Sequence, residues 1–289
     1  MSKVVDPDYP GKERLSDQEI KNLAVQESSK NVDEAVKNLK FPTETIDLPS
    51  KGLMYPETNP LSSGKLEIKY MTAREEDILT SQNLIKNGTV IDVLLKSLII
   101  SPINYNDLLV GDKNAVMIAA RILAYGKDYD VELTTPSGEK QRETVDLTQF
   151  EPKTIDEDLF VKGENRFSFT LPASKRQLEF KLLTHGDDKK IQDEIKATKK
   201  MRTRIAGVSP ELSTRLKHMI LAVDGERDRI KISKFVDEEF LSRDSLAFRE
   251  FFQDISPDID LTYTYFGETD GEENEVQLPM TVQFFWPRA

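Results

Sequence analysis

Two stretches of seven residues, LEIKYMT (residues 66–72) and LEFKLLT (residues 178–184), carry Leu, Glu, Lys and Thr at the same four positions. Each stretch alternates apolar and polar side chains, as a half-buried strand does, and ends in a threonine suited to begin a helix. Four identities of this kind would arise by chance somewhere in ~10⁴ pairwise comparisons, and the spacing fits none of the familiar repeat periods. The surrounding elements must therefore decide whether the match has structural meaning.

The elements around both stretches follow in the same order. Upstream stand IDLPSKG (residues 46–52) and FTLPASK (residues 169–175), each an apolar strand end closed by Leu-Pro and a small polar turn. Downstream stand VLLKSLII (residues 93–100) and TRLKHMIL (residues 214–221), both apolar at helical spacing with a lysine on the far face. This shared order raises the weight of the match.

Two β-hairpin candidates, residues 129–147 and 260–285, close the two series of elements. We therefore predict an α+β fold of two related lobes that arose by internal duplication. Each lobe should contain short antiparallel strands, several helices and a terminal β-hairpin, within the length of an ordinary small domain. The expected divisions are a flexible polar N-terminal arm (1–40), a first α+β repeat (41–150), an acidic connector (151–165) and a second α+β repeat (166–289).

Capping residues mark the expected helix starts. Thr72 is followed three residues later by Glu75, which makes a capping box, and Thr184 is followed by acidic residues in the first turn. Asp112 is the expected N-cap of a helix over residues 111–125.

The N-terminal arm is polar and charged, with few large apolar residues. Ser16 and Glu19 form a capping-box pattern inside it, but two serines interrupt the apolar stripe that follows. Both a solvated tail and a helix that docks on a partner fit this pattern.

Composition limits the class of protein. With 289 residues, the chain is long enough for two modest cores or one shared core. It has no apolar run long enough for a membrane span and no apolar N-terminal segment typical of a secretory signal. The absence of cysteine fits a reducing cytoplasm. A net charge of −11 argues against duplex DNA as a partner and favours basic protein surfaces.

The sequence contains no recognisable catalytic or cofactor-binding pattern. His185 and His218 lie in different expected elements and lack the further ligands of a zinc site, so we expect a surface or cap position for the first and a solvent-facing position for the second. No nucleophile elbow and no glycine-rich phosphate loop occurs. We therefore predict no enzymatic activity, no cofactor and no bound metal.

A hydrolase or nuclease that uses carboxylates and a divalent metal is the alternative. It would need acidic residues brought together near the hairpins, such as Asp128, Asp130, Asp258 and Asp260. Aspartate is also favoured in turns for its own hydrogen bonds, which is the simpler explanation of these residues. A nucleic-acid adaptor is a third possibility, which the acidic charge disfavours.

Two groups of residues are candidates for partner binding. The basic group could meet an acidic partner or lie on a solvated helix face; it comprises Lys196, Lys199, Lys200, Arg202 and Arg204. The aromatic group at the end of the chain could pack in the core or anchor an interface; it comprises Phe284, Phe285 and Trp286.

Several long strings resemble one known family. They are FPTETIDLPSKGLMYP, GKLEIKYMTAREEDILTSQNLIKNGTVIDVLLKSLI, NDLLVGDKNAVMIAARILAYGKDYDVEL and TVQFFWP, and the resemblance covers residues 41–289. The chain is similar to the baseplate hub subunit and hub-assembly proteins of T-even-like (T4-type) contractile-tailed bacteriophages.

The resemblance implies a non-enzymatic protein that helps to build the central hub of a phage tail baseplate. Its partners would be other baseplate hub and tail proteins, with no nucleic acid, membrane or metal. It would act in the host cytoplasm during assembly, and the resemblance leaves open whether it stays in the virion tail as a subunit or leaves as an assembly chaperone.

The chain departs from the resembling proteins at its hairpin tips. Many of those proteins carry C-P-x-C-G and C-x-x-C-G zinc knuckles there, whereas this chain reads TPSG (residues 135–138) and GETDG (residues 267–271). Pro136 and the turn glycines remain, but the thiolates that would hold zinc are missing. We therefore expect metal-free, zinc-ribbon-like tips.

Overall fold

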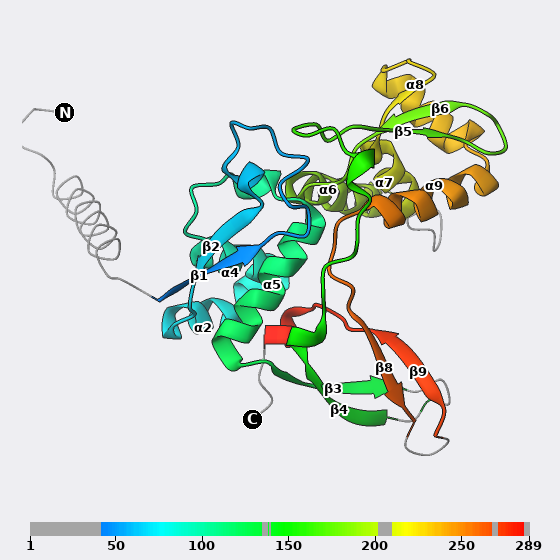
Figure 1. Ribbon diagram of the computed structural model, residues 1–289. Helices are drawn as coiled ribbons and strands as arrows, with labels where there is room; N and C mark the ends of the chain where they lie inside the picture. The colour runs from blue at the N-terminus through cyan, green and yellow to red at the C-terminus, as the bar shows by residue number, and fades with distance from the viewer. Residues whose placement is uncertain (1–41, 135–137, 139, 202–209, 268–270, 286–289) are drawn as a thin grey trace, which may run out of the picture. The chain divides into compact units, whose positions relative to one another are not determined.

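The computed structural model describes residues 42–134, 138, 140–201, 210–267 and 271–285, without the side chains of residues 199–201. The described residues after Pro42 belong to one compact unit, Thr43–Ala289. This unit combines helices with small antiparallel sheets of two or three strands, which confirms the expected mixture of α and β structure (Figure 1). The expected arm at 1–40 lies outside the described residues.

The first half pairs a short sheet with helices and ends in a hairpin. β1 and β2 are antiparallel, and the chain after α4 returns to this sheet, where Ile99 bridges Ile68. The long helix α5 then leads into the β3–β4 hairpin (Figure 1). The elements are β1 (Thr43–Asp47), η1 (Pro60–Ser63), β2 (Lys65–Lys69), α2 (Ala73–Thr80), α3 (Gln82–Asn87), α4 (Val90–Leu98), η2 (Tyr105–Asp107), α5 (Val110–Tyr125), β3 (Asp128–Thr134) and β4 (Lys140–Asp146).

The second half begins with another antiparallel pair, and a third strand joins it. β7 pairs with β6 directly after α7, with Ile220 opposite Phe180. α9 then leads into the β8–β9 hairpin. The elements are η3 (Leu147–Gln149), η4 (Glu157–Leu159), β5 (Phe167–Thr170), β6 (Gln177–Phe180), α6 (His185–Met201), α7 (Glu211–Met219), β7 (Ile220–Val223), α8 (Arg229–Lys234), the π-helical turn η5 (Phe235–Glu239), α9 (Ser242–Ile255), β8 (Thr262–Phe266), β9 (Glu273–Gln277) and η6 (Val282–Phe285).

The predicted capping box at the start of α2 is confirmed. The Glu75 carboxylate accepts hydrogen bonds from the main-chain N–H of Thr72 at 3.0 Å and from its hydroxyl at 2.6 Å. The ammonium of Lys69, at the end of β2, lies 2.8 Å from the same carboxylate. Glu75 is fully buried, so this ion pair and the capping bonds together compensate for its lost hydration.

The start of α6 repeats this arrangement. The Asp187 carboxylate accepts hydrogen bonds from the main-chain N–H of Thr184 at 3.2 Å and from its hydroxyl at 3.1 Å. Lys181, directly after β6, pairs with Asp187 at 2.7 Å. The expected role of Thr184 as a capping residue is therefore confirmed.

Asp112 has a different role from the predicted one. α5 begins one residue earlier than expected and Leu109 is its N-cap, so the prediction of an Asp112 cap is wrong. The Asp112 carboxylate is fully buried and accepts hydrogen bonds from the N–H of Ser50 at 2.9 Å, its hydroxyl at 2.7 Å and the Tyr55 hydroxyl at 2.6 Å. It thus fixes the turn that follows β1 against α5.

A second buried carboxylate fixes the corresponding turn of the second half. Asp244, in the first turn of α9, accepts the main-chain N–H of Ala173 at 2.6 Å and that of Ser174 at 3.0 Å. In both turns a lysine, Lys51 or Lys175, takes a positive φ of 51° or 62°.

One hydrophobic cluster runs through both halves. Its largest fully buried side chains come from both halves and include Leu94, Leu95, Phe180, Phe248 and Phe284. Phe180 packs edge-on against Phe248, with 5.0 Å between the ring centroids, which places α9 over the β5–β6 pair. The described residues therefore share one core.

Main-chain pairing joins the first half to the second at one place and the segment after η3 to the chain before β8 at another. Leu109 bridges Thr184, and the N–H of Val110 donates to the carbonyl of Leu183 at 3.1 Å. At the second place Pro152 bridges Ile259. No helix in the described ranges is long and apolar enough to cross a membrane.

Candidate functional site

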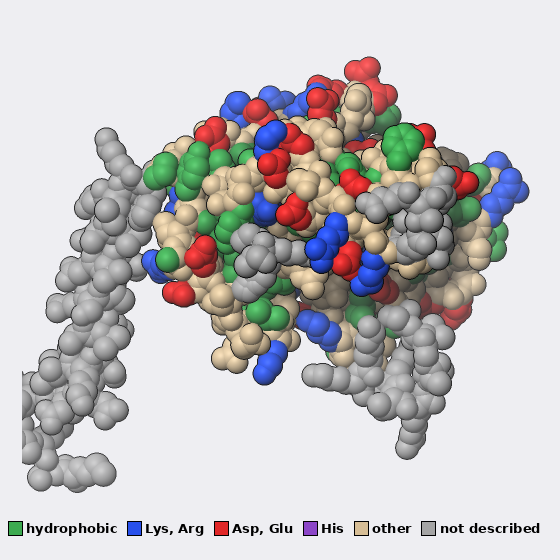
Figure 2. Space-filling model, turned by 90° about the horizontal axis from the view of Figure 1, so that it is seen from below, with side chains coloured by type: hydrophobic (Ala, Val, Ile, Leu, Met, Phe, Trp, Pro, Cys, Tyr) green, Lys and Arg blue, Asp and Glu red, His purple; other side chains and the backbone are tan. Residues whose placement is uncertain are grey.

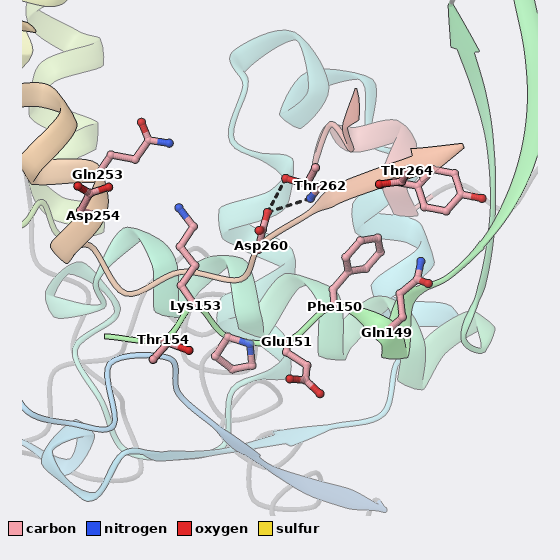
Figure 3. Close-up of a pocket in the computed structure, with 12 residues that line it drawn as sticks. Gln149, Phe150, Glu151, Lys153, Thr154, Gln253, Asp254, Asp260, Thr262 and Thr264 are labelled. Carbon is pink, nitrogen blue, oxygen red and sulfur yellow. Dashed lines mark hydrogen bonds between the residues drawn. The ribbon is translucent and has the colours of Figure 1, made fainter. Parts of the chain in front are cut away.

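An open groove of about 910 Å³ lies beside β8 (Figure 3). One wall is the segment that follows η3, the other is β8, and the end of α9 lies above them. The lining residues are Gln149, Phe150, Glu151, Pro152, Lys153, Thr154, Gln253, Asp254, Asp260, Thr262, Tyr263 and Thr264.

The groove exists because a short antiparallel ladder stops. The N–H of Lys153 donates to the carbonyl of Asp258 at 2.8 Å, and the N–H of Asp260 donates to the carbonyl of Glu151 at 3.2 Å. The next outward N–H, that of Thr262, donates to the side chain of Asp260 at 3.0 Å. Because this bond replaces a main-chain pairing, the two segments separate and leave the groove between them.

The edge of β8 that faces away from β9 borders the groove. Leu278 donates its N–H to the carbonyl of Leu261, and Gly267 donates its N–H to the carbonyl of Glu272, so the odd-numbered residues of β8 face β9. The main-chain groups of Thr262 and Thr264 therefore face the groove side.

Acidic side chains outnumber basic ones around the groove. The Lys153 side chain points into the space between Asp254 and Asp260, whereas the Glu151 carboxylate turns away from β8 (Figure 3). Hydrogen bonds from the Thr262 side chain and main chain, with a further contribution from Lys153, hold the pKa of Asp260 below its usual value. Asp260 is therefore ionised at neutral pH.

A second pocket, of about 430 Å³, adjoins the groove and shares Lys153, Gln253 and Asp260 with it. It lies where the two halves meet, and its apolar lining comprises Leu109, Val110, Leu182, Leu183, Phe252, Pro257 and Ile259. Gly111 allows this close packing, because a Cβ atom there would lie 1.8 Å from the carbonyl oxygen of Pro257. The groove thus continues into an apolar pocket.

The structure places two of the three candidate aromatic residues in the core. Phe284 and Phe285 are 1% and 0% exposed, so they offer no surface to a partner in this conformation, and Trp286 lies outside the described residues. The carbonyl of Phe284 accepts a hydrogen bond from Nε of Arg121 at 3.0 Å, and its ring packs against Tyr129 at 5.0 Å. Of the two interpretations of this group, core packing is the one that these contacts fit.

The candidate basic group is described only in part. Lys196 is exposed on α6, the side chains of Lys199 and Lys200 are not described, and Arg202 and Arg204 lie outside the described residues. On the face drawn in Figure 2, basic and acidic side chains are interspersed.

The carboxylates of the hydrolase alternative have structural partners. Asp130 accepts the Thr144 hydroxyl at 2.7 Å, Asp258 accepts the Asn114 amide at 3.0 Å, and Asp260 accepts from Thr262. Asp128 is exposed on β3. Among the described residues, no three His, Asp or Glu side chains are grouped to hold a metal ion.

His185 is the first residue of α6, at the predicted helix start, but it lies in a buried polar cluster, so a surface position is wrong. It is 4% exposed and packs on Tyr105 with 4.5 Å between the ring centroids. Its neighbours Asp92 and Lys113, from α4 and α5, form an ion pair at 2.7 Å. The sequence carries no local signal for this cluster, because its members come from four separate elements. His218 is half-buried rather than fully solvent-facing, and it pairs with Glu194 of α6 at 3.0 Å.

Comparison with known proteins gives one match. Residues 53–286 match the family of T4 bacteriophage base plate proteins. No curated protein and no solved structure matches the chain. The matched segment spans η1 to η6 and includes both capping boxes, both hairpins and the groove. Because it covers most of the sequence, the chain belongs to the T4 bacteriophage base plate protein family.

Proposed function

We propose that this chain is a non-enzymatic component of the baseplate hub, either a hub subunit or a hub-assembly factor, that acts through protein–protein contacts during tail assembly. The match over residues 53–286 to phage base plate proteins carries the proposal. Its partners would be other hub and tail proteins, met in the host cytoplasm before the tail is complete.

The described residues support a binding role over a catalytic one. Three of the four acidic residues that an enzyme would need accept structural hydrogen bonds, Asp130 across a hairpin, Asp258 from α5 and Asp260 from Thr262. The groove beside β8 is open, lined mainly by polar residues and bordered by a strand edge, which suits an extended protein segment.

We further propose that the two halves arose by duplication, with repeats at residues 41–150 and 166–289 joined by the connector 151–165. The capping boxes support this, because the members of the Lys69–Thr72–Glu75 set and the Lys181–Thr184–Asp187 set stand at a constant spacing of 112 residues.

The buried carboxylates Asp112 and Asp244 add support for a duplication. Each lies in the first turn of a helix that precedes a hairpin, and each accepts main-chain N–H groups from a turn that follows Leu-Pro. Independent origins would have to reproduce both this hydrogen-bonding pattern and the order of the elements.

We propose that both hairpin tips fold without metal. Gly138 and Gly271 have φ values of 88° and 67°, the left-handed conformation that tight turns favour in glycine. Residues 135–137, 139 and 268–270 of these tips lie outside the described residues. Elemental analysis of the purified protein should therefore find no stoichiometric zinc, and one zinc per tip would contradict this proposal.

Deletion of the gene tests the proposed function. Phage that lack this protein should produce heads but no complete baseplates, and expression of the protein from a plasmid should restore them. Complete, infectious tails without the protein would rule out the proposed role.

Mass spectrometry of purified virions separates the two forms of the proposal. Stoichiometric peptides from this chain would identify a hub subunit. Their absence from virions, together with their presence in assembly intermediates, would identify an assembly factor.

A further inference from the structure

We propose that the groove beside β8 binds an extended, basic segment of a neighbouring baseplate protein, which adds to the edge of β8 as a short strand. This inference rests on the proposed function, because it assigns a surface and a chemical class to one of the assembly contacts.

The first argument is the unfilled position on the edge of β8. Along the edge that faces away from β9, the N–H of Asp260 bonds to Glu151, that of Thr262 bonds to the Asp260 side chain, and the carbonyl of Phe266 accepts Nε2 of Gln141. Thr264 stands between these bonded positions, and no hydrogen bond joins its outward main chain to another described residue. An extended peptide can supply both the missing donor and the missing acceptor.

The second argument is charge. Asp254 is exposed, has no ion pair within the described part of the chain and faces the groove from α9, while Asp260 lies across from it. Lys153 offsets only one of these two charges. The chain as a whole carries −11, so its long-range field also attracts a cationic segment.

The third argument is the adjoining apolar pocket of about 430 Å³. It opens from the groove past Lys153 and Asp260, and Leu183, Phe252 and Ile259 line it. One large aliphatic or aromatic side chain of the bound segment would fit this space and fix its register along β8. The expected ligand therefore alternates basic and apolar residues around one larger apolar anchor.

A fluorescent peptide of about ten residues that alternates Lys and Val around a central Leu is a direct probe. Full-length protein should bind it with a dissociation constant on the order of 10 µM, and binding should weaken as salt is raised. A matched peptide with Glu in place of Lys should bind at least about tenfold more weakly. A third peptide, N-methylated at alternate residues, should also bind weakly because it lacks main-chain donors.

Two charge variants give opposite predictions. Asp254→Lys should weaken binding of the Lys peptide by on the order of tenfold, whereas Lys153→Gln should strengthen it by about threefold, because a cation beside the groove that repels the peptide is removed. Asp77→Lys is the matched control, since Asp77 is also an exposed aspartate on a helix, and it should leave the affinity unchanged.

A proline variant tests the strand edge. Thr264→Pro removes an N–H that faces away from β9, so the hairpin should remain folded while the peptide binds on the order of tenfold more weakly. Glu275→Pro, at the position opposite Thr264, removes an N–H from the other edge of the same hairpin and should leave binding unchanged. Circular dichroism checks that each variant is folded. If the Thr264→Pro variant does not fold, the N-methylated peptide still tests the same strand edge on the wild-type protein.

Equal binding of the Lys and Glu peptides, loss of affinity in Asp77→Lys as large as in Asp254→Lys, or full binding of the N-methylated peptide would each overturn the groove assignment. If the gene deletion still abolishes baseplates, those results would contradict only the groove proposal and not the proposed hub function. If the peptides bind as predicted but the deletion phage makes normal baseplates, the groove proposal would be supported and the proposed hub function contradicted.

Discussion

Nδ1 of His185 lies 3.4 Å from Nζ of Lys113, while its Nε2 lies 3.5 Å from a carboxylate oxygen of Asp92. An ammonium can only donate, so Nδ1 must accept from Lys113, and the ring proton is then on Nε2, facing Asp92. This neutral tautomer satisfies all three groups. A second ring proton would point at the Lys113 ammonium.

We expect the stability of the fold to depend on His185 in mildly acidic solution. Burial, followed by the charge of Lys113, lowers the pKa of His185 from its usual 6.5. The unfolded chain therefore takes up a proton that the folded chain refuses, so the free energy of unfolding falls as pH decreases below about 6.5. Urea unfolding at about pH 7.5 and about pH 5.5 should show this loss.

Substitution of the two histidines separates this effect from general acid sensitivity. His185→Gln keeps a donor toward Asp92 but cannot be protonated, so it should flatten the pH dependence between about 5.5 and about 7.5. His218→Gln removes the other histidine, which pairs with Glu194, and is the matched control for the substitution itself. Equal slopes in wild type and His185→Gln would contradict the role of this ring.

We expect Lys69→Met to destabilise the protein by about 3 kcal/mol, because it leaves the buried Glu75 carboxylate without its cation. Lys65→Met is a matched control on the same strand, since Lys65 pairs with Asp47 in solvent, and it should unfold at the wild-type urea concentration. Chemical denaturation measures both. If both variants lose a similar free energy of unfolding, the buried Lys69–Glu75 pair would contribute no more to stability than the exposed pair.

The same Lys69 substitution should change the acid sensitivity of the protein. Burial raises the pKa of Glu75, but the hydrogen bonds from Lys69 and Thr72 outweigh it and hold the pKa below 4.5. A lowered folded-state pKa contributes stability that is present above about pH 4.5 and lost as pH falls through the folded value. Lys69→Met should reduce this contribution, and its free energy of unfolding should approach that of wild type as Glu75 becomes protonated.

Asp112→Ala should be among the most destabilising substitutions, at about 3–5 kcal/mol, because it leaves Ser50 and Tyr55 with buried donors and no acceptor. Tyr55→Phe removes one bond to Asp112 and the bond that its hydroxyl accepts from the N–H of Leu109 at 2.9 Å, and it should cost about 2 kcal/mol. Thermal unfolding of both variants checks the order. A stable Asp112→Ala protein would mean that water replaces the carboxylate in this turn.

Phe284→Ala should destabilise the fold by about 3–5 kcal/mol, since the ring is fully buried against Tyr129 and Phe285. Phe266→Ala is the control, because the Phe266 side chain is 65% exposed, and its unfolding midpoint should stay close to wild type. Retained stability in Phe284→Ala combined with lost partner binding would reinstate the end of the chain as an interface.

Local chemistry accounts for what the sequence could predict. The Thr72–Glu75 box, the β1 and β2 strands that precede it and the hairpin strands depend on residues close together in the chain, so pattern and capping rules find them. The sequence pattern extends the last hairpin to residue 285, and the structure ends it earlier. β9 stops at Gln277, before Pro279, and Phe284 and Phe285 lie in a 3₁₀ turn rather than in a strand.

Long-range pairing explains what the sequence could not predict. The local sequence around Asp112 predicts a helix cap. Its role as a buried hydrogen-bond acceptor depends on a tertiary contact with Ser50, 62 residues earlier in the chain. His185 reads as a surface residue until α4, α5 and η2 close around it. The groove depends on where the pairing between residues 151 and 260 ends, which no local window of the sequence contains.

The main-chain bonds that join Leu109 to Thr184 and Pro152 to Ile259 also limit how this protein can be divided. If the chain is cut between residues 150 and 166, each fragment keeps the sequence patterns that form its own helices and strands. Each fragment would nevertheless expose a strand edge and part of the shared apolar core. We expect each fragment to aggregate when produced alone and the two to form a soluble heterodimer when produced together. A working split protein of this kind could report assembly in living cells, with reconstitution as the signal.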